Sequence, residues 1–297
     1  MKIRSYGSLY PSTIKLDGGA MFGIIPKPLW SKKITPDELN RIPMTMRVMV
    51  LQEGNRLVLI DAGAGDYQGE KFNERYGLKH PPVSFRELLH RMLGATPEDV
   101  TDIVLSHLHF DHASGALTTE GLLPAFPHAT LHLHQEHYHY SKKPTLRDSG
   151  SFQDTIIHKI VEYYVTKKQI HWLTGHEGTL LFEDTNNPLF FKTCHGHTPF
   201  QILPYDHKMI FLADLVPTHA HFNIPWVMGY DMHPGVSATE RAELYPWIKH
   251  NQLMCVFDHD LQYWGAKITG PSNDQLILSD MQKITHELYE WHQNIQS

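Results

Sequence analysis

The sequence predicts an α/β fold, and three observations support this prediction. Short apolar runs rich in β-branched residues alternate with stretches whose apolar residues recur at helical spacing. Several of the predicted strands end in His or Asp. The 297 residues are 41% hydrophobic and 20% charged, which is the composition of a soluble globular protein with a sizeable core. Because we find no linker, we expect a single domain over residues 1–297.

In the first half of the chain, residues 46–61 form two β-rich runs around Glu53-Gly54-Asn55, which predicts a hairpin. A helix is expected after Ser84, which forms a capping box with Glu87. Residues 102–106, DIVLS, then read as a short buried strand. The apolar face of the expected helix consists of Phe85, Leu88, Leu89, Met92 and Leu93.

The second half continues the alternation of strands and helices. A helix is expected to begin near Ser237, where Ser237 and Glu240 fit another capping box. Residues 272–293 have the spacing of a closing amphipathic helix through Leu276, Ile277, Met281, Ile284 and Leu288. The predicted strands are residues 190–194, 200–205, 208–214 and 253–260.

Charge and composition exclude several classes of protein. The net charge is −6 and no block of Lys and Arg is present, so we expect no nucleic-acid partner. The N-terminal residues lack the apolar region of a signal peptide, and no apolar stretch is long enough to span a bilayer. Cys194 and Cys255 cannot form a disulfide framework. We therefore expect a cytoplasmic protein without membrane contact.

The segment SHLHFDHASG, residues 106–115, follows the buried strand and concentrates possible metal ligands. In an extended segment, alternate side chains point the same way, so His107 and His109 can bind one ion together. Asp111 and His112 lie where the chain turns and can approach a second ion. Neutral imidazole and carboxylate suit zinc and similar divalent metals, and a carboxylate can bridge two of them.

A second histidine-rich segment, HLHQEHYHY at residues 132–140, is interpreted differently. It lacks the H-x-H-x-D-H spacing of residues 107–112, and no glycine turn follows it. We therefore expect an ordinary strand followed by a helix start, without a metal site at His132 and His134.

The H-x-H-x-D-H string is followed by Gly196-His197-Thr198-Pro199, Ala213-Asp214 and Asp258-His259. In their order and spacing these four signals resemble the metallo-β-lactamase superfamily. Within it, Gly18-Gly19-Ala20-Met21-Phe22-Gly23 and the following Pro-Lys-Pro-Leu-Trp are similar to the lactonase and organophosphate hydrolase branch, which includes quorum-quenching lactonases. The resemblance implies a four-layer αββα sandwich with a dinuclear metal site along one edge.

The resemblance also implies a ligand for each position of that site. His107, His109 and His197 would hold the first ion, Asp111, His112 and His259 the second, and Asp214 would bridge them. Zinc is the expected metal, although manganese, iron or cobalt would suit the same ligands. A hydroxide bridging the two ions would attack a lactone or a related ester. Asp111 would orient this hydroxide and pass a proton to the leaving group.

Weaker signals concern residues around the ligands. Thr198, Asp258 and Asp61 are candidates for fixing imidazole tautomers, with turn capping as the alternative. A neutral, partly apolar substrate is expected, although core packing would explain about half of the pocket residues and a homodimer interface could use those near the N-terminus. Lactonases of the branch commonly carry a tyrosine where this chain has Pro217, so Tyr230, His219 or His221 would have to replace it. The candidate pocket residues are Phe22, Ile24, Trp30, His219, His221, Trp226, Met228 and Tyr230.

Several functions share this ligand set. Phosphotriester hydrolysis and a thioesterase of the glyoxalase II type are alternatives to ester hydrolysis, although we identify no basic patch for glutathione carboxylates. A di-iron oxidoreductase normally needs a partner flavin or rubredoxin domain and replaces one histidine by a carboxylate, neither of which fits this sequence. A non-catalytic metal-binding protein is the remaining alternative, and a count of roughly two ions per chain would argue against it.

Overall fold

A computed structural model describes residues 4–118, 123–183, 187–273 and 275–296. The chain divides into two compact units, each built around a β-sheet. The first unit comprises Met1–Thr13, Met46–Thr174 and Thr285–Ser297, and the second comprises Ile14–Thr45 and Gly175–Ile284. The single domain expected from the sequence stays a prediction.

The first sheet has the strand order β14-β1-β2-β3-β4-β5-β6. The predicted hairpin is confirmed, because β2 and β3 pair antiparallel up to Glu53 and Arg56, and Gly54 turns with a φ of 62°. From β3 to β6 the strands are parallel, so their carboxyl ends lie at one edge of the sheet. The strands are β1 (Ser5–Asp17), β2 (Arg41–Glu53), β3 (Arg56–Ile60), β4 (Asp102–Val104), β5 (Thr130–His134), β6 (Ile170–Leu173) and β14 (Tyr289–Trp291).

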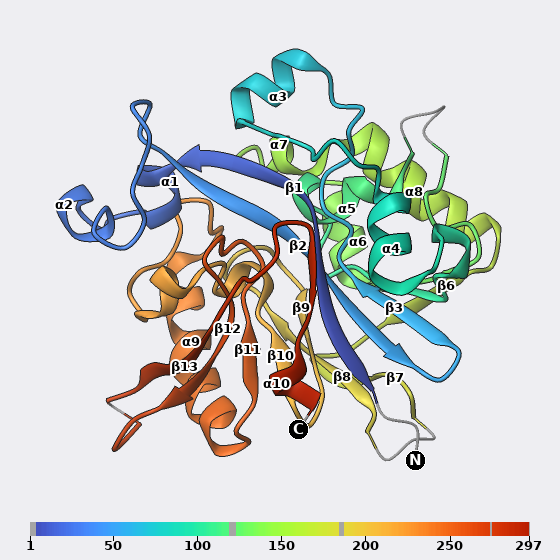
Figure 1. Ribbon diagram of the computed structural model, residues 1–297. Helices are drawn as coiled ribbons and strands as arrows, with labels where there is room; N and C mark the ends of the chain where they lie inside the picture. The colour runs from blue at the N-terminus through green and yellow to red at the C-terminus, as the bar shows by residue number, and fades with distance from the viewer. Residues whose placement is uncertain (1–3, 119–122, 184–186, 274, 297) are drawn as a thin grey trace. The chain divides into compact units, whose positions relative to one another are not determined.

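Helices of the first unit pack on this sheet around one apolar core. As predicted, Ser84 caps α4, accepting a hydrogen bond from the backbone N–H of Glu87. Leu88, Leu89 and Tyr164 join strand residues in the core, and Figure 1 shows α4 and α8 beside β3 and β6. These elements are α3 (Glu70–Tyr76), α4 (Phe85–Leu93), η1 (Pro97–Asp99), α5 (Phe110–Ala113), η2 (Ser114–Ala116), α6 (Gln135–Ser141), α7 (Ser149–Phe152), α8 (Asp154–Thr166) and α10 (Gln293–Gln296).

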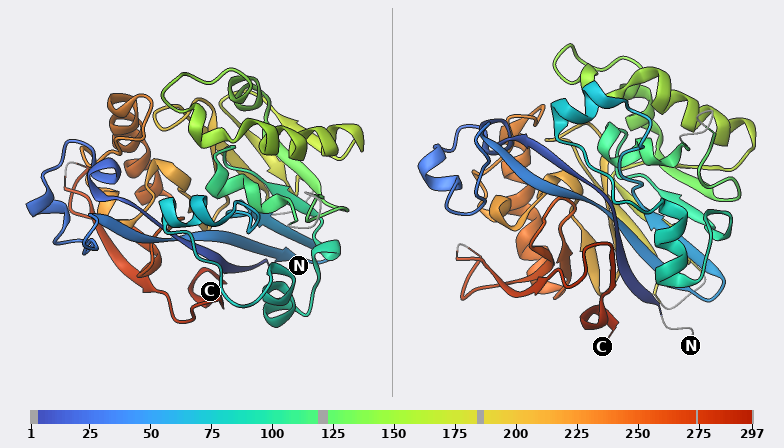
Figure 2. Two further views of the ribbon diagram at one scale, coloured as in Figure 1. Left: turned by 90° about the horizontal axis from the view of Figure 1, so that it is seen from above. Right: turned by 45° about the horizontal axis from the view of Figure 1, so that its top comes forward.

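The second sheet has the order β13-β12-β11-β10-β9-β8-β7. All four strands expected between residues 190 and 260 are present, with β10 and β11 parallel. Helix α9, orange in Figure 2, packs against β12. The elements are α1 (Gly18–Phe22), α2 (Lys27–Trp30), β7 (Glu177–Leu181), β8 (Leu189–Cys194), β9 (Gln201–Tyr205), β10 (Met209–Phe211), η3 (Ala213–Leu215), η4 (His219–Phe222), α9 (Pro234–His250), β11 (Met254–Val256), β12 (Tyr263–Thr269) and β13 (Ile277–Lys283).

The prediction of a closing helix over residues 272–293 was wrong. The segment forms β13, which pairs antiparallel with β12, and β14, which pairs with β1 (Figure 1). Ile277, placed on the apolar face of the expected helix, is 58% exposed on β13. Strand pairing supplies the backbone hydrogen bonds here, and this tertiary effect overrides the helical spacing of the apolar residues.

The start of the helix expected near Ser237 also differs. Helix α9 begins at Pro234, and Ser237 lies buried in its second turn. The Glu240 carboxylate instead accepts hydrogen bonds from the backbone N–H groups of His195 and Gly196, at 2.6 and 3.1 Å. A residue that holds the loop after β8 was therefore mistaken for a capping residue.

Among the described residues, no helix is long and apolar enough to cross a membrane.

Candidate metal centre

In the first unit, the parallel pairing of β3 and β4 brings Asp61 beside the H-x-H-x-D-H segment. Asp61 follows β3 with a φ of 61°, a left-handed conformation that Asp tolerates better than most residues. Its buried carboxylate accepts hydrogen bonds from the backbone N–H and the hydroxyl of Ser106, at 2.7 and 2.8 Å. It also accepts the Nδ1–H of His112 at 2.9 Å. The expectation that Asp61 fixes an imidazole tautomer is confirmed for His112.

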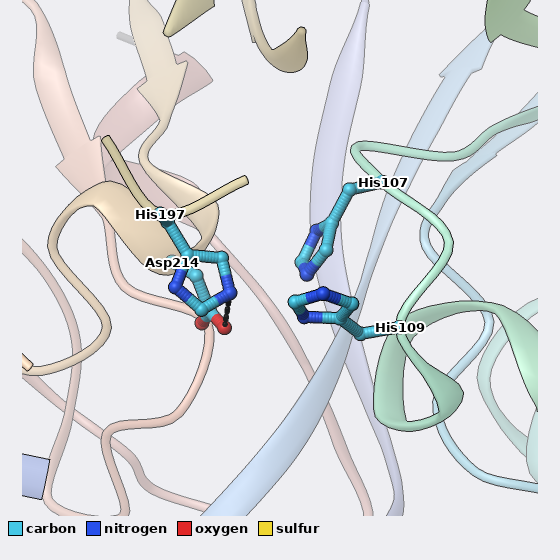
Figure 3. A group of neighbouring side chains, drawn as sticks. All are labelled: His107, His109, His197 and Asp214. Atoms are coloured by element: carbon cyan, nitrogen blue, oxygen red, sulfur yellow. Dashed lines mark ion pairs between the residues drawn. The ribbon is translucent and has the colours of Figure 1, made fainter. Parts of the chain in front are cut away.

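His107 and His109 lie side by side, as the extended segment predicts (Figure 3). Their ring centroids are 4.4 Å apart, and one nitrogen of each lies within 4.8 Å of the other. Nδ1 of His107 is 3.0 Å from the Ser106 hydroxyl, which leaves Nε2 as the nitrogen directed toward a ligand site. The backbone N–H between them, from Leu108, donates to Nε2 of His137 at 2.8 Å.

His137 is a site residue that sequence reasoning missed. It lies on α6, in the histidine-rich segment interpreted as ordinary structure. That interpretation of the segment is otherwise correct, because His132 bonds to Asp102 and His171, and His134 caps α6. His137 is identified only by its hydrogen bond with the backbone N–H of Leu108, which lies 29 residues away in the sequence.

In the second unit, Asp214 lies between two histidines. Its Oδ2 is 3.0 Å from Nε2 of His197, the ion pair dashed in Figure 3, and its Oδ1 is 3.1 Å from Nε2 of His259. The parallel strands β10 and β11 cause this meeting, because Asp214 and His259 follow them at the same edge of the sheet. His197 comes from the loop between β8 and β9.

The other ring nitrogen of each of these histidines is also held. Nδ1–H of His197 donates to Asp231 at 3.0 Å, and Nδ1–H of His259 donates to the carbonyl of Thr45 at 2.8 Å. Asp231, fully buried after the loop 223–230, was not predicted, and no spacing in the sequence points to it. Partners of this kind fix the orientation of a metal-binding imidazole.

These features fit a divalent metal. His112, His197 and His259 each use Nδ1 for a carboxylate or carbonyl partner, so Nε2 is the nitrogen oriented for a metal. An aspartate whose two oxygens face different imidazoles has the arrangement that a bridging carboxylate requires. Asp258 offers a further carboxylate oxygen to a metal, since ligand atoms of Asp214, Asp258 and His259 lie within 4.8 Å of one another.

The protonation of His197 shows how strongly the carboxylates act. Burial disfavours its charged form, but the carboxylates of Asp214 and Asp231 outweigh burial and raise the pKa of His197 to about 9. In the absence of metal, a proton therefore takes the place of a cation beside Asp214. Metal binding must release this proton, which makes metal affinity increase with pH.

Two further predicted residues have less defined surroundings. The Asp111 carboxylate lies 3.9 Å from Nε2 of His112 and is 11% exposed. The hydroxyl of Thr198 is buried and has no hydrogen-bond partner within the described part of the chain, so a role in fixing a tautomer is not seen for Thr198.

Half of the candidate pocket residues form an aromatic cluster. Phe22 stacks on Trp30 and on His221, with centroids 5.2 and 4.4 Å apart, and meets Trp226 edge-on. Phe22, Trp30 and His221 are at most 1% exposed, so packing accounts for them, as it does for Met228. Ile24 is 88% and Tyr230 39% exposed. Their roles in substrate binding stay predictions.

His221 is held neutral, with both nitrogens engaged. Nε2–H donates to the carbonyl of Met21, and Nδ1 is 2.7 Å from the hydroxyl of Thr218. Burial, together with the nearby guanidinium of Arg241, lowers the pKa of His221 to about 3. Its fixed tautomer and full burial exclude His221 as the replacement for the lactonase tyrosine.

The low pKa of His221 predicts acid sensitivity. Because the unfolded ring has a pKa of 6.5, the stabilisation is complete above pH 6.5 and is lost as the pH falls toward 3. Lowering the pH from 6.5 to 4.5 should therefore reduce the free energy of unfolding of His221→Gln by about 2–3 kcal/mol less than it reduces that of wild type. Urea titrations of metal-free protein at both pH values measure this. His139→Gln, at a half-exposed position, is the control, and an unchanged pH dependence in His221→Gln would contradict the prediction.

A second prediction concerns Asp61. An asparagine at this position would keep the size and tolerate the left-handed backbone, but it has a single acceptor oxygen. Its NH₂ group would face either the backbone N–H of Ser106 or the two donors that share Oδ2, the Ser106 hydroxyl and His112 Nδ1–H, so it cannot accept all three hydrogen bonds. Asp61→Asn should bind zinc about 10–100-fold more weakly, measured by competition with a chromophoric chelator. Asp102→Asn is the control. Asp102 is also a buried aspartate, but it is the first residue of β4, whereas Asp61 bonds to Ser106 beyond the last residue of that strand. Equal affinities of the Asp61 and Asp102 variants would show that Asp61 does not orient a ligand.

The fold and the two ligand groups define a metal-binding α/β hydrolase, and residues 47–245 match the model of the metallo-beta-lactamase superfamily. The chain belongs to this superfamily, which confirms the predicted family and the predicted αββα fold class. A search of curated proteins found no match.

Solved structures support the assignment. A probable metal-dependent hydrolase from Staphylococcus aureus is 27% identical over 96% of this chain and 99% of that one, with a TM-score of 0.82. AbOPH, a hydrolase of the beta lactamase superfamily, is 19% identical over 95% of both chains, with a TM-score of 0.72. AidC, a dizinc quorum-quenching lactonase, is 16% identical over 98% of this chain and 96% of that one, with a TM-score of 0.69. The last two show likeness of fold alone.

Proposed function

We propose that this chain is a dinuclear metal-dependent hydrolase that opens lactones or cleaves related esters. The observation that carries the proposal is Asp214, whose two carboxylate oxygens face His197 and His259. A single carboxylate placed between two imidazoles is suited to two ions held close together. Superfamily membership and the similarity to a probable metal-dependent hydrolase support the proposal.

In this proposal, the histidines and aspartates expected as ligands bind two divalent ions, with zinc as the expected metal. The ligands are His107, His109 and His197 for one ion, Asp111, His112 and His259 for the other, and Asp214 for both. Bound there, the ions would supply a hydroxide nucleophile near neutral pH and polarise the oxygen of the scissile carbonyl.

Other steps of the proposed reaction depend on side chains of the protein. Asp111, whose side chain is partly exposed, orients the attacking oxygen and removes its proton. Asp61 and Asp231 hold His112 and His197 through their Nδ1–H groups, so neither imidazole needs to reorient during the reaction. Aromatic side chains near the ligands, including Phe72 and Tyr76 packed on Phe110, favour a neutral substrate with an apolar part.

Proton release in a pH-stat tests the proposal directly. Zinc- or manganese-loaded protein is offered an aliphatic lactone, with metal-stripped protein as the control and metal content measured on the same samples. Acid production that requires about two ions per chain is the expected result. Protein that holds both ions but leaves lactones and esters intact would overturn the proposal, and a phosphotriester and a thioester in parallel assays would then identify the alternative chemistry.

A further inference from the structure

The segment after Asp214 contains a histidine whose environment differs from that of every ligand. His219, in η4, directs Nδ1–H at the carboxylate of Asp260, with a separation of 2.5 Å. The backbone N–H of His219 donates to the same oxygen at 2.7 Å. The ring of Tyr263 packs edge-on against the imidazole, with centroids 4.9 Å apart. Three contacts therefore fix the ring and its tautomer.

Asp260 is well suited to hold an imidazole that gains and loses a proton. It is 2% exposed, and its second oxygen accepts the backbone N–H groups of Gln262 and Tyr263, each at 2.8 Å. Four N–H groups thus surround one carboxylate. A buried, fully bonded carboxylate that accepts Nδ1–H stabilises the imidazolium formed when Nε2 takes a proton, as in hydrolases with a histidine–aspartate pair.

Nε2, the other ring nitrogen of His219, is available to contact a substrate. The side chain is 15% exposed, and Nε2 has no hydrogen-bond partner within residues 4–118, 123–183, 187–273 and 275–296. The pair also lies next to a proposed ligand, because Asp260 follows His259 and the backbone N–H of His259 donates to the carbonyl of Pro217 at 2.9 Å. His221, by contrast, uses both nitrogens in the core.

We propose that His219, held by Asp260, is the catalytic acid that protonates the leaving oxygen. This inference rests on the proposed ester hydrolysis. As the C–O bond breaks, its electron pair goes to the alkoxide oxygen, and Nε2–H delivers a proton to that oxygen. The ring is left neutral and takes a proton from water at its exposed edge. In this proposal Asp111 acts as the base toward the attacking oxygen, and His219 takes over the proton transfer to the leaving oxygen that the sequence analysis expects of Asp111.

Esters with different leaving groups test the proposal. A lactone releases an alkoxide that needs a proton, whereas a 4-nitrophenyl ester releases a phenolate that does not. His219→Gln, which can still donate to Asp260, should lower kcat for the lactone about 10²–10⁴-fold and kcat for the 4-nitrophenyl ester less than about 10-fold, with KM little changed. His250→Gln, an exposed histidine on α9, should match wild type on both substrates. Equal losses on both substrates in His219→Gln protein of normal metal content would overturn the proposal.

A measurement that needs no turnover separates this proposal from the proposed function. In zinc-loaded, ¹⁵N-labelled protein, His219 should give the far-downfield proton signal of a carboxylate-bound Nδ1–H, absent from His219→Gln and present in His250→Gln. A His219 that carries its proton on Nε2 and lacks it on Nδ1 would overturn the assignment. If wild type cleaves neither ester, the proposed function fails, and the NMR result alone decides whether the histidine–aspartate pair exists as described.

Discussion

Replacing Asp214 by alanine is expected to leave at most about one metal ion per chain and to lower kcat/KM by about 10³-fold or more. The reason is its position, with one oxygen 3.0 Å from His197 and the other 3.1 Å from His259. Without the carboxylate, the two imidazoles, and any ions bound to them, lose the negative charge between them. Metal analysis after gel filtration and pH-stat rates on a lactone measure the two effects.

Two other variants sharpen this prediction. Asp214→Asn keeps the shape but replaces one oxygen by an NH₂ group, so it should retain one of the two contacts and lose less metal than Asp214→Ala. Asp206→Asn changes a buried aspartate in the turn between β9 and β10 and should leave the metal content unchanged. Full metal content in Asp214→Ala would show that Asp214 is not a ligand.

The second large effect is expected at Arg241, a fully buried guanidinium on α9. Its Nε donates to the carbonyl of Leu215 at 2.8 Å, and Nη1 donates to the carbonyls of His221 and Trp226, each at 2.9 Å. Arg241 thereby fixes the segment that follows Asp214 and contains His219. Arg241→Ala leaves these carbonyls buried without a donor, so we expect the free energy of unfolding to fall by about 3–5 kcal/mol.

Urea titration measures this loss, and hydrogen exchange locates it. Arg241→Lys keeps the charge, but one ammonium cannot reach the same carbonyls, so it should recover only part of the stability. Lys249→Ala, on the same helix, should stay within about 0.5 kcal/mol of wild type. Amides of residues 215–226 should exchange faster in Arg241→Ala. Equal stability of the Arg241→Ala and Lys249→Ala variants would contradict the role of Arg241.

Local patterns were enough where neighbours in the sequence decide the structure. The hairpin at Gly54, the cap at Ser84 and the short apolar strands all formed as expected, because each depends on residues a few positions apart. The histidine-rich segment around His132 likewise formed the strand and helix start expected from its lack of the ligand spacing seen at residues 107–112.

Local patterns failed where a distant partner competes with them. Residues 277–283 have helical spacing but pair with β12, and Glu240 fits a capping box but bonds to the loop at His195. Sheet pairing and a hydrogen bond to a part-buried backbone donor each stabilise an arrangement that spacing along the chain cannot reveal.

The sequence by itself indicated the kind of protein, because the expected ligands follow strand ends, their chemistry suits divalent metals, and the order and spacing of four motifs resemble the superfamily whose model the chain matches. Only the tertiary structure decided how those ligands are held. Asp231 is 34 residues from His197, and Thr45 is 214 residues from His259, yet both hold an imidazole through Nδ1–H. His219 and Asp260, 41 residues apart, likewise form a hydrogen bond between residues that are distant in the sequence. Such contacts depend on which strand ends meet at a sheet edge, and that is fixed by packing of the whole chain rather than by any local stretch.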